Sequence, residues 1–343
     1  MTTLRAGLSG CGATGLAAVQ RTRLHGHCDI VAVHDPDPAA VRAVRERTGV
    51  GFGTTSFAEL LGTGVDFVVF AGPAGRRVDL VRSAAEQMVH CLLHAPIATS
   101  LADAASMVEA CDAAAVKLGV AVEGQDDPIL EQVRRMIAAD WFGGLVGVQG
   151  MWGEDDLLRL PPAPGDWRLE PGLVGDDPLL RLLTQHVHLT AWLCGRTALR
   201  VTAQRTGGFL PLPHDGAVAT AVLRGNVLCT FAVSHLTNAR MFAIHGTDGG
   251  VRLHGDHVSV LGRTPFHGDV FDYLDPDTET VFHRCDLAPA IAKQRGAHEL
   301  HGRFARWIDD LDDFPCPGEQ ALADLRIVQA MRRAADTEAA QSP

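Results

Sequence analysis

The chain has 343 residues, of which 46% are hydrophobic and 21% charged, so it is long enough for about two globular domains. Its 41 acidic residues outnumber its 30 basic residues, and no run of Lys or Arg concentrates positive charge, which argues against nucleic acid or an anionic membrane as a partner. No apolar stretch approaches the roughly 20 residues of a membrane span and the N-terminus has no signal-peptide pattern, so we expect a cytoplasmic protein.

The first third of the chain alternates short strands with helices. The predicted strands span residues 4–9, 30–34, 65–70, 89–93 and 120–122, and the predicted helices span residues 14–25, 39–48, 78–88 and 101–118. The strands are apolar throughout, which is typical of a parallel sheet covered by helices on both faces. Residues 1–124 are therefore predicted to form a doubly wound α/β domain.

A second α/β domain, residues 125–343, is predicted from a change in this rhythm. Its expected helices span residues 128–139, 177–194, 297–311 and 319–336, and its expected strands span residues 145–151, 199–206, 217–223, 226–235, 241–246, 250–254 and 257–261. A helix opening at Asp177 and Pro178 has a cap and first-turn pair typical of N-termini. Strands joined by short turns predict a large open sheet that is mostly antiparallel.

A glycine-rich loop lies between the first strand and the first helix. The loop reads Gly10-Cys11-Gly12-Ala13-Thr14-Gly15, and Asp35 ends the next strand. In the G-x-G-x-x-G pattern the first glycine makes a tight turn, the second lets backbone N–H groups approach a pyrophosphate, and the third lets helix and strand pack closely. A carboxylate at Asp35 is placed to bind a ribose diol. The sequence therefore predicts a dinucleotide-binding domain over residues 1–124.

The order of several motifs resembles the Gfo/Idh/MocA oxidoreductase family, whose fold is a Rossmann domain followed by an α/β domain with a large open sheet. The motifs are the loop at 10–15, Val31-Ala32-Val33-His34-Asp35, Phe57-Ala58-Glu59-Leu60-Leu61, Val65-Asp66-Phe67-Val68-Val69, Trp192-Leu193-Cys194-Gly195, the hairpin at 244–250 and Pro315-x-Pro317-Gly318-Glu319. The resemblance covers nearly the whole chain. It implies that the cofactor contacts come from Gly10, Gly12, Ala13, Thr14, Gly15, Asp35, Gly72, Pro73, Arg77 and Pro96.

The chain departs from this family where the family carries its catalytic groups. The usual Glu-Lys-Pro triplet is replaced by His94-Ala95-Pro96, so the lysine is absent. The family pattern T-P-N-x-x-H is replaced by residues 72–77, which end in Arg76-Arg77. In the D-x-x-x-H pattern of the helix before Trp192, the register puts Arg181 at the aspartate and Gln185 at the histidine. The family's usual alcohol-oxidising machinery is therefore not intact.

Histidine is the residue type that could replace the lysine, because its side chain titrates near neutral pH. The chain has 16 histidines. His94 and His186 are the candidate catalytic residues, with a capping or core role as the alternative for each. Arg181, Gln185, His188, His235 and Trp167 are the candidate substrate-binding residues. His186 and His188 are two residues apart on one helix and point in different directions, so they cannot jointly bind a metal.

No metal site is predicted. The eight cysteines are scattered and never form a C-x-x-C pair, which indicates buried reduced thiols. His298-Glu299-Leu300-His301 does not have the H-E-x-x-H spacing, so we expect this segment to form a solvated helix face.

The sequence as a whole predicts an NAD(P)-dependent oxidoreductase that acts on a small polar metabolite. NAD is expected over NADP because the Asp35 carboxylate would oppose a 2′-phosphate and residues 36–38 offer no arginine. Two alternatives remain: a redox-neutral enzyme that retains NAD as a structural or transient hydride carrier, and a non-catalytic dinucleotide sensor. Residues 227–233 are apolar at odd and even positions, which predicts a sheet covered on one face by helices and on the other by a second subunit in a homodimer or homotetramer.

Overall fold

A computed structural model describes residues 3–23, 26–162, 166–174 and 179–343, except for the side chains of residues 295–298. The chain divides into two units, which are described separately. The first unit comprises Met1–Glu123, Gly172–Gly175 and Gly296–Leu322, and the second comprises Gly124–Pro171, Asp176–Arg295 and Ala323–Pro343. Each unit is thus built from segments that are distant in the sequence.

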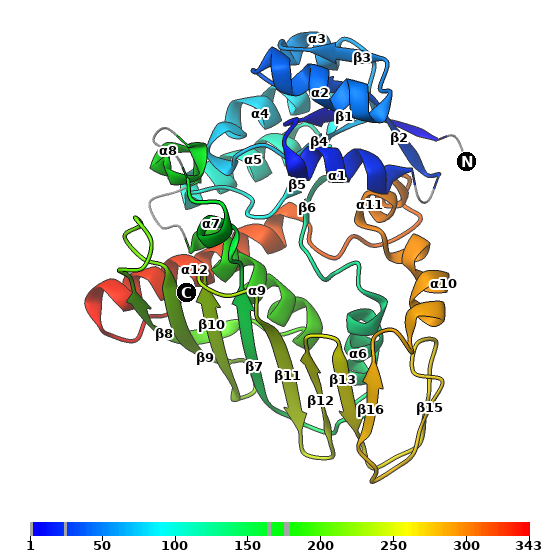
Figure 1. The fold of residues 1–343 in the computed structure, drawn as a ribbon, viewed down its shortest axis with the longest axis vertical. Coiled ribbons are helices and arrows are strands. Elements are labelled where there is room, and N and C mark those ends of the chain that lie inside the picture. The colour runs from blue at the N-terminus through cyan, green and yellow to red at the C-terminus, as the bar shows by residue number, and fades with distance from the viewer. Residues whose placement is uncertain (1–2, 24–25, 163–165, 175–178) are drawn as a thin grey trace. The chain divides into compact units, whose positions relative to one another are not determined.

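The first unit contains a six-stranded parallel sheet in the order β3-β2-β1-β4-β5-β6 (Figure 1). Its strands are β1 (Leu4–Ser9), β2 (Cys28–His34), β3 (Phe52–Thr54), β4 (Phe67–Phe70), β5 (His90–His94) and β6 (Leu118–Ala121). The strand order reverses between β1 and β4, and open α/β sheets bind ligands outside the carboxyl ends of the strands at such a switch point. The predicted doubly wound fold is confirmed.

Short helices connect these strands. They are α1 (Ala13–Thr22), α2 (Pro38–Thr48), α3 (Phe57–Leu61), η1 (Ala74–Arg76), α4 (Val78–Glu86) and α5 (Leu101–Ala113). The Ser100 side chain accepts the Asp103 N–H at the start of α5, so this helix begins where the sequence predicted, at residue 101. The end predicted for the first helix, residue 25, lies outside the described residues.

The C-terminal part of the first unit completes its core. Helix α11 (Leu300–Ile308) contacts α1 and strands β2, β5 and β6. Phe304 is fully buried, and its ring centroid lies 5.4 Å from the ring centroids of both Phe67 and Phe314. Aromatic rings at this spacing stabilise a core beyond the area that they bury. Residues 296–322 therefore pack with the parallel sheet, although they follow the whole second sheet in the sequence.

The second unit contains an eight-stranded sheet in the order β16-β13-β12-β11-β7-β10-β9-β8. Its strands are β7 (Leu145–Gly153), β8 (Ala198–Thr206), β9 (Gly216–Leu223), β10 (Val227–Ser234), β11 (Arg240–Gly246), β12 (Gly250–His254), β13 (His257–Leu261) and β16 (Thr280–His283). β7 and β10 pair in parallel, and the other pairings among the described strands are antiparallel. The predicted mostly antiparallel sheet is confirmed.

The second unit also contains helices and a small hairpin. They are α6 (Pro128–Ala138), α7 (Asp156–Arg159), η2 (Trp167–Leu169), α9 (Leu180–Cys194), the pair β14 (Phe266–His267) and β15 (Tyr273–Leu274), and most of α10 (Ala288–His298). Besides α10, helices α8 (Pro171–Val174) and α12 (Gly318–Thr337) take residues from both units. Helix α9 packs against α6 and against strands β7 and β10. Asp177 and Pro178, the predicted start of the helix before Trp192, lie outside the described residues.

The two faces of the second sheet differ in exposure. Along β10, Val227, Cys229 and Phe231 are at most 2% exposed, whereas Leu228 between them is 64% exposed. Thus one face packs against helices, and the other carries exposed apolar side chains. The exposed face also carries Val218, Met151 and Met241, which lie in one row across neighbouring strands. Thr220, Thr230 and Gln149 form the next row across the same face.

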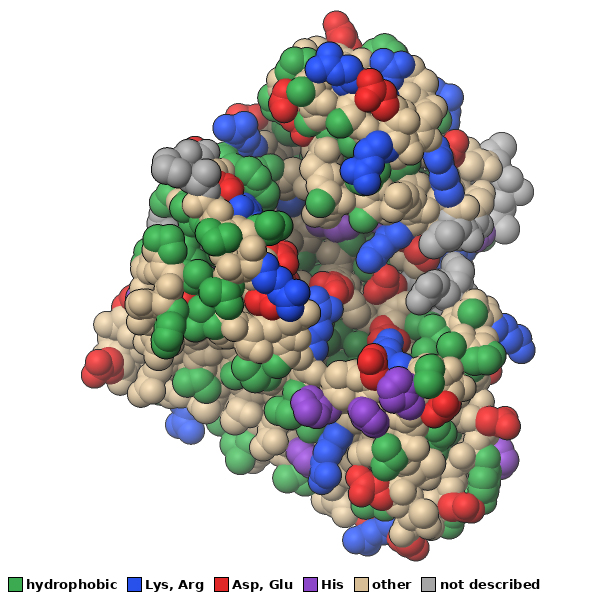
Figure 2. Space-filling view, in the orientation of Figure 1, with side chains coloured by type: hydrophobic (Ala, Val, Ile, Leu, Met, Phe, Trp, Pro, Cys, Tyr) green, Lys and Arg blue, Asp and Glu red, His purple; other side chains and the backbone are tan. Residues whose placement is uncertain are grey.

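Within the described residues, no helix combines the length and the apolar character that a bilayer crossing requires. Figure 2 shows basic and acidic side chains interspersed over the visible face of the molecule. This mixing agrees with the absence of a basic run in the sequence.

Candidate functional site

The glycine loop of the first unit connects β1 to α1 at the switch point. Gly10 has a φ of +106°, and a Cβ at this position would lie 2.4 Å from the backbone nitrogen of Gly72. A Cβ at Gly15 would lie 2.0 Å from the carbonyl oxygen of Gly10, whereas one at Gly12 would meet no atom within 4 Å. Gly10 and Gly15 are therefore required by close packing, and Gly12 leaves open space above the loop.

The start of α1 suits an anion. The helix begins at Ala13, with Thr14 in its first turn, and Gly12 at its N-cap gives no side-chain hydrogen bond to the first N–H groups. Free N–H groups at a helix N-terminus, together with the helix dipole, favour phosphate. The open space at Gly12 and these uncapped N–H groups fit the pyrophosphate of a dinucleotide.

Asp35 follows β2 and is held beside this loop. Its Oδ2 accepts the Cys11 N–H at 2.8 Å, and its Oδ1 accepts the Asp37 N–H at 2.9 Å. A carboxylate has about four lone-pair positions, so capacity remains for the hydroxyls of a ribose. The structure thus brings the predicted ribose-binding carboxylate and the predicted phosphate loop together.

Arg77, one of the predicted cofactor contacts, directs its side-chain hydrogen bonds to backbone carbonyl oxygens. Its Nη1 donates to the carbonyl oxygens of His94, at 2.5 Å, and Pro96, at 2.8 Å. Its Nε and Nη2 donate to the carbonyl oxygen of Gly72 at 3.1 and 2.6 Å. The residue is buried, and burial lowers the pKa of its guanidinium to about 9. Arg77 therefore joins the loops that follow β4 and β5, which also carry Pro73 and Pro96.

His94 ends β5 at the position where the resemblance implies a glutamate. It is partly buried, its Nε2 has no hydrogen-bond partner, and its ring centroid lies 5.7 Å from that of His301. Burial, followed by the charges of His301, Arg77 and Arg21, lowers the pKa of His94 from 6.5 to about 3, and Glu299 acts in the opposite direction. The His94 ring is therefore neutral at pH 7.

The expectation of a solvated helix face at residues 298–301 was wrong. Glu299 and His301 are 4% and 1% exposed. Glu299 Oε2 accepts the Gly302 N–H at 2.8 Å, and its Oε1 lies 2.5 Å from Nδ1 of His301. Helix α10 ends before Glu299 and helix α11 begins after it, so Glu299 is a helix cap and not a mid-helix residue. The sequence feature that could have indicated this helix start is the Glu299 carboxylate, three residues before the N–H group that it accepts.

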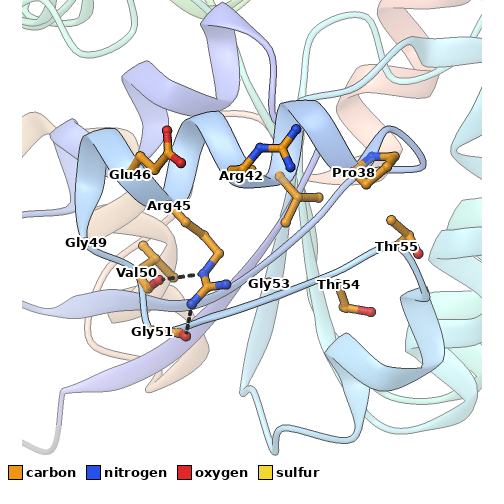
Figure 3. Close-up of a pocket in the computed structure, with 11 residues that line it drawn as sticks. Pro38, Arg42, Arg45, Glu46, Gly49, Val50, Gly51, Gly53, Thr54 and Thr55 are labelled. Atoms are coloured by element: carbon orange, nitrogen blue, oxygen red, sulfur yellow. Dashed lines mark hydrogen bonds between the residues drawn. The ribbon is translucent and has the colours of Figure 1, made fainter.

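A large groove in the first unit lies elsewhere, between α2 and β3. It has a volume of about 790 Å³, and Arg45 crosses it to donate to the carbonyl oxygens of Val50 and Gly51 at 3.2 and 2.8 Å (Figure 3). Neither the glycine loop nor Asp35 nor His94 lines it. This groove is therefore distinct from the candidate cofactor site.

In the second unit, His186 lies within the contact between α9 and the sheet. It is fully buried, with ring centroids 4.9 Å from Phe231 and 5.8 Å from Phe242, and both ring nitrogens lack a partner. A Cβ at Gly150 would lie 2.0 Å from its ring, so the glycine makes room for the imidazole. Burial lowers the pKa of His186 to about 4. Within this unit, these surroundings favour a packing role.

His188 points in another direction from His186, as the helical spacing predicted. Its Nδ1 pairs with Oδ2 of Asp324, and both side chains are at most 2% exposed. Buried pairs of this kind are costly to break, because the remaining partner is left unsatisfied. The pair therefore joins α9 to the residues of α12 that belong to this unit.

A polar cluster follows the parallel strands β7 and β10. Glu154 comes directly after β7, and its carboxylate forms two hydrogen bonds with Arg181, the first at 2.6 Å. Burial alone would raise the pKa of Glu154, but Arg181, Arg240 and His235 outweigh it and lower the pKa. His235 comes directly after β10 and is 4% exposed. Parallel strands end at the same edge of a sheet, which is why these side chains meet.

The remaining predicted residues lie around this cluster. Gln185 is one helical turn beyond Arg181 on α9 and is buried, whereas Trp167 is 51% exposed in η2. Arg240 stacks over Trp152, with its guanidinium carbon 4.5 Å from the ring centroid. The sequence analysis missed Glu154 and Arg240, although Glu154 lies three residues after the predicted strand 145–151 and Arg240 lies directly before the predicted strand 241–246. Among the described residues, no group of three His, Cys, Asp or Glu could hold a metal ion.

Part of the first unit matches a known protein family. Residues 4–122 match the model of the Gfo/Idh/MocA family, an oxidoreductase family with an NAD-binding Rossmann fold, which confirms the resemblance. D-xylose 1-dehydrogenase (NADP(+)) 2 of Haloferax volcanii is 27% identical over 170 residues, which are 49% of this chain and 51% of that enzyme. A D-xylose 1-dehydrogenase [NADP(+)] of Haloarcula marismortui is 24% identical over 55% of this chain and 53% of its own length. The chain thus matches about half the length of these curated relatives.

Solved structures resemble the chain over nearly its whole length. WlbA dehydrogenase from Bordetella pertussis, in complex with NADH and UDP-GlcNAcA, is 22% identical with a TM-score of 0.86, and covers 99% of this chain and 98% of its own. Aldose-aldose oxidoreductase from Caulobacter crescentus, complexed with glycerol, is 17% identical with a TM-score of 0.82, and both chains are covered fully, at 100%. At sequence identities of 22% and 17%, this structural similarity shows that the chain shares the fold of these proteins.

The buried position of His186 predicts a loss of stability in acid. Below pH 6.5 the unfolded chain binds a proton on this ring, but the folded chain does so only near its pKa of about 4. The free energy of unfolding should therefore fall as the pH falls through this window, by roughly 3 kcal/mol from this residue. In urea unfolding at several pH values, His186→Leu should show a smaller fall than the wild type. The exposed His254→Leu is the control and should keep the wild-type fall; an unchanged fall in His186→Leu would contradict the assignment.

Proposed function

Residues 4–122 match the Gfo/Idh/MocA oxidoreductase family, whose Rossmann fold binds NAD, and on this premise we propose that the chain is an NAD-dependent dehydrogenase of small polyhydroxylated substrates. The observation that carries the proposal is the pairing of an open, uncapped glycine loop with the Asp35 carboxylate fixed on Cys11. A bound nicotinamide would supply hydride transfer.

Aldoses are the proposed substrate class. The support is twofold: the curated relatives act on D-xylose, and the second unit carries the cluster Glu154, Arg181, His235 and Arg240. Carboxylate and guanidinium groups at the end of two parallel strands can bind several hydroxyl groups of one small molecule. Gln185 and Trp167 are proposed as further contacts.

We propose His94 as the group that exchanges a proton with the substrate hydroxyl. The family lysine is absent at Ala95, and His94 is the adjacent titratable side chain. Its ring is neutral at pH 7, so it has a lone pair to accept a proton when a hydroxyl is oxidised. The Glu299 carboxylate favours the charged form that results. His186 is the weaker candidate, because apolar rings surround it.

The first test measures reduced nicotinamide formation with NAD and a panel of aldoses, starting with D-xylose. His94→Gln should lower kcat by a factor of about 10² to 10⁴, as removal of a general acid or base typically does. Its melting temperature and NAD affinity should stay near the wild-type values. The exposed His257→Gln should keep full activity. Unchanged turnover in folded His94→Gln would exclude His94 as the proton-transfer group.

The second test concerns NAD against NADP. The Asp35 carboxylate would repel a 2′-phosphate, so calorimetry should give tighter binding of NAD. Asp35→Asn should narrow this preference by about tenfold, because one unit charge is removed next to the phosphate. Asp29→Asn, an exposed change in strand β2, which Asp35 follows, should leave the preference unchanged. Equal binding of both dinucleotides by the wild type would refute the proposal.

The third test concerns assembly. We propose that the exposed face of the second sheet, with Leu228, Val218 and Met241, pairs with the same face of a second copy as a homodimer, which can pair again into a tetramer. Light scattering should then give at least twice the 36.6 kDa of one chain. Leu228→Lys should shift the mass to one chain, whereas Met88→Lys, an exposed apolar position in the first unit, should not. A wild-type mass of one chain would contradict the proposal.

A further inference from the structure

Arg77 is a buried cation whose bonds all go to neutral groups. Within the described part of the chain, its hydrogen bonds end on the carbonyl oxygens of Gly72, His94 and Pro96. Side-chain guanidinium groups are rarely buried without a carboxylate, because desolvation of an unpaired charge costs several kcal/mol. The fold therefore retains an uncompensated positive charge at this place.

The place is the carboxyl edge of β4 and β5. Gly72 follows β4, His94 is the last residue of β5, and Pro96 follows β5. The carboxylate that acts on His94 is Glu299, which is bonded to His301 and to the Gly302 N–H. Glu299 therefore has partners of its own, and the bonds of Arg77 do not include it. The exposed neighbour Arg76 does not share this position.

The same edge is where the nicotinamide half of a dinucleotide belongs. A dinucleotide crosses the switch point between β1 and β4, with one mononucleotide on each side. Asp35 at the end of β2 assigns the adenosine half to the β2 side, so the nicotinamide half falls on the side of β4 and β5. The contact between Gly10 and Gly72 shows that the two sides meet backbone to backbone.

We propose that Arg77 sets the redox preference of the bound cofactor, so that the protein binds NADH more tightly than NAD⁺. The oxidised nicotinamide ring carries one positive charge, and the addition of a hydride, two electrons and one proton, removes it. A fixed cation beside the ring therefore disfavours the oxidised form and leaves the reduced form unaffected. This inference rests on the proposed dinucleotide binding and adds the residue that biases it.

The size of the effect follows from Coulomb's law. A unit charge within about 10 Å, at an effective dielectric constant of about 20, changes a binding constant by about tenfold. Because Arg77 is buried, added salt should screen this effect only weakly. Arg77 thus acts as a positioning and electrostatic residue, through its charge and through the loops that it joins.

The test is the ratio of the dissociation constants of NAD⁺ and NADH, measured by calorimetry in the absence of substrate. The wild type should give a ratio of about ten or more, and a ratio near one would overturn the proposal whatever the variants do. Arg77→Gln should lower the ratio by about tenfold, Arg77→Lys should retain it, and Arg76→Gln should leave it unchanged.

A purely structural role for Arg77 gives a different result. Loss of the loop contacts alone would weaken both dinucleotides equally, so an unchanged ratio in folded Arg77→Gln would overturn the proposal. Arg77→Met is the second uncharged variant if Arg77→Gln does not fold, and the wild-type ratio stands as an independent test. ADP-ribose, which lacks the nicotinamide, tests dinucleotide binding separately from the effect of Arg77 on the nicotinamide ring. If the wild type binds neither ADP-ribose nor either dinucleotide, the proposed function fails, and not the role of Arg77 alone.

Discussion

The close approach of two backbones at the switch point is the constraint on which the first unit depends. Gly10 and Gly72 meet so closely that no side chain fits between them. One side of this contact positions the open N-terminus of α1, and the other side presents the carbonyl oxygen of Gly72 to Arg77. Arg77 then binds the carbonyl oxygens of His94 and Pro96. A continuous series of backbone contacts thus links the phosphate loop to the end of β5.

The features that the sequence predicted well are local. Glycine spacing predicted the loop, and alternating apolar runs predicted the long strands of both sheets. Very short elements such as β3, β14 and β15 carry too few residues to show a period. Pairs such as His188 and Asp324 are 136 residues apart, so no spacing could reveal them. The boundary between α10 and α11 depended on a cap at Glu299 that was interpreted as part of a longer helix.

The histidines illustrate why residue type alone does not assign a role. His94, His186 and His188 all lie on regular elements near predicted site positions. Apolar rings surround His186, a buried carboxylate holds His188, and cations together with a second histidine surround His94. Burial lowers the pKa of both His186 and His94, and nearby positive charges add to this effect at His94 alone. The neighbours therefore decide which ring can exchange a proton with a substrate.

Two positions at which the sequence differs from the family pattern, residues 77 and 95, lie close together in the structure. The lysine is replaced by Ala95, and the histidine of the T-P-N-x-x-H pattern is replaced by Arg77. The Arg77 guanidinium binds the carbonyl groups on both sides of Ala95, so a lysine at this position would place a second positive charge beside the first. Like charges at short range in a buried environment repel strongly. Arg77 would thus disfavour a charged lysine at residue 95.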